Sequence, residues 1–188
     1  MASQMSASEL LMAIQKQQLE HDEFYHREIA RLPMPHRLQH MALHISKYFA
    51  RIVHGEMEPE LKNRTWTDTF IISVSMCNIL NRKLVDLWGL EDASLKADEV
   101  GGWINDMFES SATSDHRIRH FAKLCEATSN ASEKMDHIEE FPYRTVLGQS
   151  AGQLAGMAAI EIQKFGELFE VVTSRLDGVK AKNIFHEL

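Results

Sequence analysis

Five basic side chains share one side of a predicted helix. They follow one another at intervals of three or four residues, and they are His36, His40, His44, Lys47 and Arg51. Such a stripe is a solvated face, a groove that binds an anion such as phosphate, or part of a metal site, because histidines at i and i+4 share a metal ion. The metal interpretation requires His36 and His40 to meet His116 and His120, which have the same spacing 80 positions later.

A single carboxylate, Asp68, stands at the start of the most apolar stretch of the chain. Thr65 and Asp68 have the spacing of a helix start, where a carboxylate stabilises the first turn. The alternative is that Asp68 faces a groove as a ligand for a metal ion or a substrate. Asn78 and Asn81 lie farther along the same predicted helix, and buried amides need hydrogen-bond partners. They either clamp two helices together or contact a bound base or sugar.

Three glycines recur at intervals of four residues in the last long predicted helix: Gly148, Gly152 and Gly156. Inside a helix, glycine is less favourable than alanine by about 1 kcal/mol. We therefore expect something to approach this side of the helix closely. We favour a second helix, from the same chain or from the partner in a dimer, as the group that packs against the glycines. The alternative is a ligand that contacts the exposed helix backbone.

A short phrase occurs twice and indicates how the chain is organised. Residues 36–43 read HRLQHMAL, and residues 116–123 read HRIRHFAK. Each copy opens a predicted helix that is followed by a second, more apolar helix. The chain therefore predicts two related helical hairpins packed together. A four-helix arrangement of this kind builds its sites between facing helices.

Apolar residues at helical spacing and only four prolines predict an all-α helical bundle in one domain, residues 1–188. We divide it into an N-terminal helix (1–32), a first hairpin (36–90) and a second hairpin (114–176). A charged loop is expected at 55–64. The long helices are expected at about 8–30, 36–54, 65–87, 115–139 and 143–176, with a short helix around Trp103 and Gly178 capping the last helix.

Composition narrows the function classes. The net charge of −7 argues against a general nucleic-acid-binding protein, which needs a basic surface. No stretch reaches the length and apolarity of a membrane span, and the N-terminus lacks the features of a secretory signal, so we expect a cytoplasmic protein. Cys77 and Cys125 stand in apolar stretches and are expected to be buried free thiols.

The segment from about residue 36 to residue 90 resembles the all-α nucleoside triphosphate pyrophosphohydrolases, the MazG-like and dimeric dUTPase-like group. The resemblance lies in the order of helix, charged loop and apolar helix. Asp68 matches the last carboxylate of the family's ExxD motif, and Asn78 matches a recurrent asparagine. The resemblance implies a four-helix core in which carboxylates hold Mg²⁺ or Mn²⁺ against nucleotide phosphates.

The chain departs from that family at most of the metal-binding positions. The two acidic positions of its ExxE motif fall on His44 and Lys47, and the first acid of ExxD falls on Thr65. A complete carboxylate cluster for magnesium is missing there, whereas lysine and histidine bind a phosphate directly. In the second half, Glu133 and Asp136 have ExxD spacing, but they do not open the buried helix.

Two hypotheses follow. The first is a divergent MazG-like protein that binds a nucleotide or another phosphorylated ligand in the groove between helices. Its candidate ligand-binding residues are His44, Lys47, Arg51 and Asn78, and Asp68 is the catalytic candidate, with catalysis left open. The second is a non-enzymatic interaction module that forms a homo-oligomer through the glycine-lined helix and the polar first helix.

Two further motifs are weaker. Glu23 and His26 have the spacing of a di-iron ligand pair, but no second pair of that kind follows. His21-Asp22 is an HD dipeptide of the kind found in metal-dependent phosphohydrolases, but the remaining ligands are not evident from the sequence.

Overall fold

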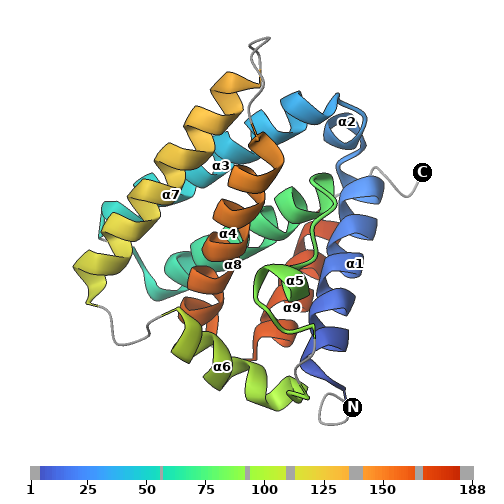
Figure 1. The fold of residues 1–188 in the computed structure, drawn as a ribbon, viewed down its shortest axis with the longest axis vertical. Helices are drawn as coiled ribbons and strands as arrows, with labels where there is room; N and C mark the ends of the chain where they lie inside the picture. Colours follow the sequence, from blue (N-terminus) through green and yellow to red (C-terminus); the bar gives the residue numbers. More distant parts are fainter. Residues whose placement is uncertain are drawn as a thin grey trace.

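Four long helices form the centre of an all-α bundle (Figure 1). They are α3 (Met34–Val53), α4 (Pro59–Ile79), α7 (Ser114–Lys134) and α8 (Tyr143–Gln163). Helix α3 packs against α7, and α4 packs along α8.

The computed structural model describes residues 5–55, 57–91, 94–108, 113–135, 142–163 and 167–182. No helix in these ranges has both the length and the apolarity needed to cross a membrane.

Shorter elements surround these four helices. They are α1 (Ala7–Tyr25), α2 (Arg27–Ala30), α5 (Leu84–Leu87), the 3₁₀ helix η2 (Ala97–Glu99), α6 (Val100–Met107) and α9 (Leu168–Lys180). Helix α1 contacts α4 and α9 on the side of the bundle opposite α7 (Figure 1). Its start is fixed by the predicted capping box, because the Glu9 amide donates to the Ser6 hydroxyl and the Ser6 amide donates to the Glu9 carboxylate.

The two predicted hairpins contain helices of similar length in the same order, α3 with α4 and α7 with α8. Helix α3 begins at Met34 and α7 at Ser114, so both copies of the phrase lie in the first turns of their helices. Helices α4 and α8 both have 21 residues. Their starts are 84 positions apart, and so are the starts of α5 and α9. The position in α8 equivalent to Asp68 is therefore Gly152.

The prediction that the central helix starts at Thr65 is wrong. Helix α4 already begins at Pro59, whose fixed φ suits the first position of a helix. The predicted loop at 55–64 is therefore largely helical, and Asp68 lies in the third turn of α4. The Thr65 hydroxyl donates to the Leu61 carbonyl at 2.7 Å instead of capping the helix.

Other helix ends also differ from the prediction. The first helix is interrupted at His26, where φ is −124° and ψ is 44°. The central helix ends before α5 because Asn81 adopts a φ of 53°, in the left-handed region. The predicted final helix is divided into α8 and α9, and Gly178 lies inside α9 instead of capping it.

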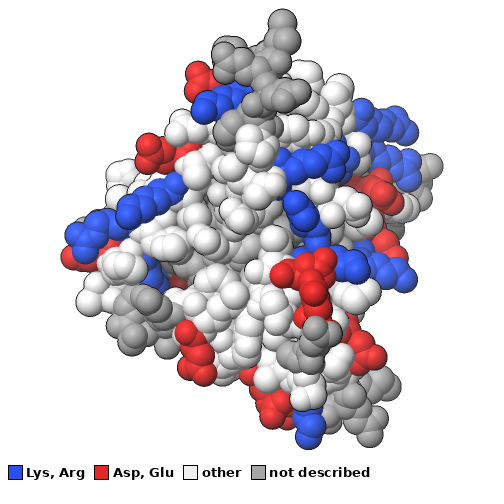
Figure 2. Space-filling view, in the orientation of Figure 1, with Lys and Arg blue, Asp and Glu red and all other residues white. Residues whose placement is uncertain are grey.

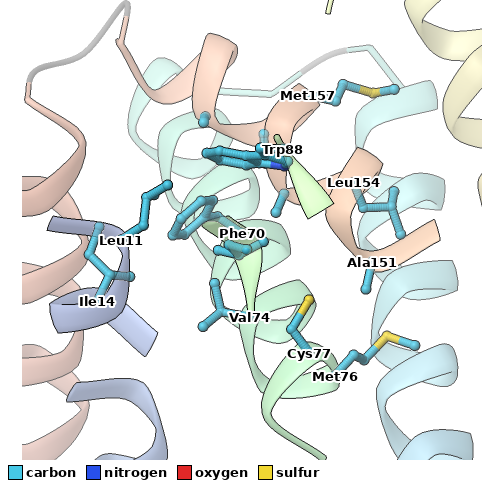
Figure 3. Close-up of a cluster of buried hydrophobic side chains, with 14 of the residues drawn as sticks. Leu11, Ile14, Phe70, Val74, Met76, Cys77, Trp88, Ala151, Leu154 and Met157 are labelled. Atoms are coloured by element: carbon cyan, nitrogen blue, oxygen red, sulfur yellow. The ribbon is translucent and has the colours of Figure 1, made fainter. Parts of the chain in front are cut away.

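Helix α4 is the buried centre of the core, as its apolar character predicts. Figure 3 shows side chains of α1 and α8 on opposite sides of α4. Leu11 and Ile14 belong to α1, Phe70 and Val74 to α4, and Ala151 and Leu154 to α8. The hydroxyls of Thr67, Thr69 and Ser73 each donate to the carbonyl four residues earlier in α4.

Of the two cysteines, Cys77 is fully buried, and burial raises its pKa to about 12. Cys125 is only partly buried.

The glycines of α8 lie beneath side chains of the segment that follows α4. In order along the helix, the glycines are Gly148, Gly152 and Gly156, and the nearest side chains are those of Arg82, Leu87 and Phe108. A Cβ at Gly156 would stand 2.3 Å from the Phe108 ring. The Trp88 indole donates to the Gly152 carbonyl at 3.0 Å. This side of α8 is thus covered by side chains of the same chain, and not by the closely packed helix backbone that the glycine spacing favoured.

Two glycine substitutions should change stability in opposite directions. Gly156→Ala should lower the free energy of unfolding by roughly 1–2 kcal/mol, because the Phe108 ring must move and overpacking outweighs the better helix propensity. Gly178→Ala should raise it by roughly 0.5–1 kcal/mol, because nothing lies within 4 Å of the added methyl group. Urea denaturation of both variants measures this, and a stabilised Gly156→Ala protein would contradict the packing described.

Candidate functional site

A cavity of about 370 Å³ lies between α1, α2, α3, α4 and α9. Its size is in the range of small-molecule sites. One part of its lining is apolar and includes Ile29, Met41, Ile71 and Ile72. The remainder carries imidazole, guanidinium and carboxylate groups, which belong to His21, Asp22, His26, Glu28, Arg37, His40, His44, Asp68 and Arg175.

Three of the residues that the sequence places on the basic stripe and at the start of the apolar stretch line this cavity: His40, His44 and Asp68. His44 Nδ1 lies 3.1 Å from the Tyr48 hydroxyl oxygen. Lys47 and Arg51 are exposed and lie outside the cavity, with their charged groups 4.8 and 5.8 Å from the centre of the Tyr48 ring. The structure therefore brings His44 and Asp68 to one site and leaves the two exposed cations outside it.

Asp68 forms a bidentate ion pair with Arg175 of α9. Arg175 Nε donates to Asp68 Oδ1 at 2.7 Å, and Arg175 Nη2 donates to Oδ2 at 3.3 Å. The two side chains are only 12% and 20% exposed, respectively. Arg64 adds a longer contact, 3.8 Å from its Nε to Asp68 Oδ2. Both carboxylate oxygens are thus held by arginine, so Asp68 connects α4 to α9.

Asn78 clamps α1 to α4 and lies outside the cavity. Its Nδ2 donates to the Gln15 backbone carbonyl at 3.0 Å, and its Oδ1 accepts a hydrogen bond from Gln15 Nε2 at 3.0 Å. Gln15 Oε1 in turn accepts from the Leu84 amide at 2.7 Å. Of the two interpretations of this asparagine, the contacts match the inter-helix clamp.

A group that the sequence indicated only weakly lies in the same cavity. His21, Asp22 and His26 each offer one ligand atom, and these atoms lie within 4.8 Å of one another. The HD dipeptide and His26 thus belong to one cluster, whereas Glu23 is not part of it. The signal that sequence reasoning missed is the end of α1 at His26, where the chain turns and the His26 ring centre comes within 5.6 Å of the His21 ring centre.

The predicted four-histidine metal site does not form among the described residues. His40 lines the cavity, whereas His116 and His120 line a separate hollow next to α8. His36 is exposed. The two copies of the repeated phrase therefore place their histidines at different sites.

That second hollow has fewer charged groups in its lining than the first cavity: Arg117 lines it and pairs with the buried Glu161 at 3.2 Å. Gly152 stands at the position equivalent to Asp68, and the Trp88 side chain covers it. Glu133, half of the ExxD-spaced pair in the second hairpin, is exposed on α7. Asp136, the other half, lies outside the described residues. The comparison of the two hairpins singles out the first cavity as the candidate site.

Burial keeps three of the cavity histidines, His21, His40 and His44, uncharged. Desolvation, followed by the nearby Lys47 charge, lowers the pKa of His44 from 6.5 to about 4. Desolvation is also the main cause that lowers the pKa values of His21 and His40. These imidazoles are neutral at pH 7 and can each donate and accept hydrogen bonds. The positive charge of the cavity at that pH therefore comes from its arginines.

Several buried polar atoms of the cavity residues have no hydrogen-bond partner among the described residues. They are Nε of Arg37, both ring nitrogens of His21 and Oε1 of Gln18. The Leu176 backbone favours the charged form of His21, but burial outweighs it. An unpaired buried polar group costs about 1–3 kcal/mol. A ligand that supplied partners for these atoms would gain binding energy from them.

On the face seen in Figure 2, lysine and arginine lie mainly in the upper half of the view, and most of the acidic side chains lie in the lower half. Comparison of the chain with known protein families, curated proteins and solved structures gives no match. The functional argument therefore rests on the residues of the cavity.

Breaking the Asp68–Arg175 pair should destabilise the fold. Asp68→Asn leaves the largely buried Arg175 guanidinium without its counter-charge and should lower the free energy of unfolding by about 2–3 kcal/mol. Arg64→Ala is the matched control, because this arginine is 53% exposed and 3.8 Å from the carboxylate; its loss should cost less than about 0.5 kcal/mol. Chemical denaturation measures both, and equal effects would contradict the assigned role of Arg175.

Stability should also fall as the pH decreases from 6.5 towards about 4. In that interval the unfolded chain protonates His44, whereas the folded chain does not, so protons bind preferentially to the unfolded state. His44→Gln should reduce the loss of Tm between pH 7 and pH 5 by roughly 2–4 °C. The exposed histidine variant His36→Gln should leave the loss unchanged, and a His44→Gln profile identical to the wild-type profile would contradict the neutral His44.

Proposed function

We propose that the cavity binds a small phosphorylated molecule, with nucleotides as the first class to test. The observation that carries the proposal is Arg37, which lines the cavity and whose buried Nε has no partner among the described residues. The planar guanidinium group holds a phosphate through several parallel donors. Neutral His40 and His44 line the same cavity and supply further hydrogen bonds without a charge.

The apolar lining favours an organic phosphate over the inorganic ion. Ile71 and Ile72 of α4 and Ile29 of α2 line the same cavity as Arg37. Small-molecule sites combine such apolar surface with a few polar groups that fix orientation. A base or a similar flat group suits the isoleucines while its phosphate meets the guanidinium.

The arrangement of hairpins supports a distant relationship to the MazG-like group. The resemblance implies a four-helix core of two hairpins, and α3, α4, α7 and α8 have that arrangement. His44 and Asp68, which take positions of the family's metal-binding acids, line one cavity. We infer that the chain is a divergent member of that group whose groove binds ligand.

The residues at these positions do not fit a magnesium or manganese cluster. His44 and Lys47 replace two acids, and the Thr65 hydroxyl is engaged by the Leu61 carbonyl. The remaining acid, Asp68, is paired with the Arg175 guanidinium, whose positive charge opposes a second cation at the same carboxylate. Mg²⁺ favours carboxylate oxygens and phosphates, so we propose binding without pyrophosphate release by the family's route.

The interaction-module hypothesis has less support from the contacts. It uses the glycine-lined side of α8, which Arg82, Leu87 and Phe108 cover within the chain. A homo-oligomer built on that side would have to displace those side chains. Oligomer formation remains an expectation of the sequence, and it becomes the favoured explanation if no phosphorylated ligand binds.

Arg37→Ala should abolish most of the ligand response. In a thermal-shift panel of nucleoside mono-, di- and triphosphates, the wild-type chain should be stabilised by at least one of them. Arg37→Ala should weaken its binding by about tenfold or more, because a charge-assisted hydrogen bond contributes roughly 1.5–3 kcal/mol. Arg51→Ala is the matched control, since this arginine lies outside the cavity, and it should bind like the wild type.

The same panel with Mg²⁺ and Mn²⁺ should give no pyrophosphate release above a no-protein control. Release that disappears in Asp68→Asn would contradict the proposal of binding without hydrolysis. An absence of stabilisation by every nucleotide and by simple sugar phosphates would contradict the phosphate site itself.

A further inference from the structure

The wall of the cavity nearest the end of α1 holds a compact set of metal-ligand atoms. One atom each from His21, Asp22 and His26 lies within 4.8 Å of the others. A tetrahedral ion with bonds of roughly 2.0–2.2 Å places its ligands about 3.3–3.6 Å apart. Small side-chain rotations therefore suffice to bring the three atoms to one ion. We propose that His21, Asp22 and His26 bind a divalent transition-metal ion of the zinc class, with its fourth position open to the cavity.

His21 is the strongest single observation for this site. The residue is only 8% exposed, and neither ring nitrogen makes a hydrogen bond of good geometry among the described residues, although the Leu176 backbone is close enough to interact with the ring. Buried polar groups in folded proteins are nearly always paired, so an orphan of this kind requires an explanation. An ion bound by one ring nitrogen supplies the missing partner.

Asp22 is already oriented by neighbouring side chains. Gln18 Nε2 donates to Asp22 Oδ1 at 2.8 Å, and the Ser75 hydroxyl of α4 donates to Oδ2 at 2.6 Å. A carboxylate oxygen that accepts one hydrogen bond retains a lone pair for a metal. Hydrogen bonds of this kind hold a ligating carboxylate in place and tune its affinity.

The end of α1 sets the position of the third ligand. His26 is the residue at which α1 stops, and its amide still donates to the Asp22 carbonyl at 3.0 Å. This hydrogen bond fixes the turn that keeps the His26 ring near His21, with ring centres 5.6 Å apart. The site thus depends on the helix end as well as on the three residue types.

The donor set selects the class of ion. Two imidazoles and one carboxylate suit zinc, cobalt, nickel or iron, whereas Mg²⁺ prefers oxygen ligands. Three protein ligands with a free position are typical of sites that bind a further molecule at the metal. The inference rests on this donor set alone, so it stands or fails independently of the nucleotide proposal.

The test is a Zn²⁺ titration of the full chain by calorimetry after chelator treatment. We expect one high-affinity ion per chain. His26→Gln and Asp22→Asn should each weaken binding by on the order of 100-fold, and Ser75→Ala, which removes only the hydrogen bond to the carboxylate, by about tenfold. His36→Gln, an exposed histidine on α3, is the matched control and should bind like the wild type.

Cobalt substitution identifies the ligands independently of affinity. Co²⁺ should give the visible bands of a low-coordinate site, without the charge-transfer band of a thiolate ligand, and His26→Gln should remove those bands. Circular dichroism confirms that each variant is folded before titration. Wild-type protein that binds no Zn²⁺, or a His26→Gln variant that binds it as tightly, would overturn the proposal, as would a thiolate band from Cys77 or Cys125.

Discussion

Two hydrogen bonds between Arg175 and Asp68 connect the last described helix to the middle of the buried helix α4. The cavity depends on this contact, because it fixes α9 against α4 and thereby places Arg175 and Leu176 in the cavity lining. A charge as buried as Asp68 is costly without a partner. The ion pair satisfies that requirement, and the positive charge of the guanidinium also opposes the binding of a metal cation by Asp68. The ion pair between Asp68 and Arg175 therefore determines both the position of α9 and the ligands that Asp68 can bind.

The charge balance of the cavity follows from burial. His21, His40 and His44 are neutral near pH 7 because desolvation lowers their pKa values. Asp68 and Arg175 neutralise each other, and the other charged groups of the lining are Arg37 and the carboxylates of Asp22 and Glu28. The buried Nε of Arg37 is unpaired among the described residues. Neutral imidazoles are also the form that binds metal ions. An anion site and a metal site are thus compatible within one cavity, since neither requires the histidines to carry a charge.

The sequence predicted the bundle better than the site. The repeated phrase located α3 and α7, and the apolar run located the buried part of α4, because both patterns reflect local burial. The helix ends at His26 and Asn81 were missed, since neither position carries a proline or glycine. His44 and Asp68 were found from the basic stripe and from the start of the apolar stretch, and the family resemblance assigned both to one groove. Arg175 was not, because its contact with Asp68 spans 107 positions and leaves no local pattern.

The central claim is that Arg37 recognises the phosphate of a small ligand inside this cavity. Its most direct test is an NMR titration of the arginine side-chain Nε–Hε signals with the nucleotide that stabilises the protein most. The account predicts a saturable shift of the Arg37 signal, with the Arg175 signal remaining in place because its Nε donates to Asp68. A saturable shift confined to exposed arginines such as Arg51, with Arg37 unchanged, would contradict it.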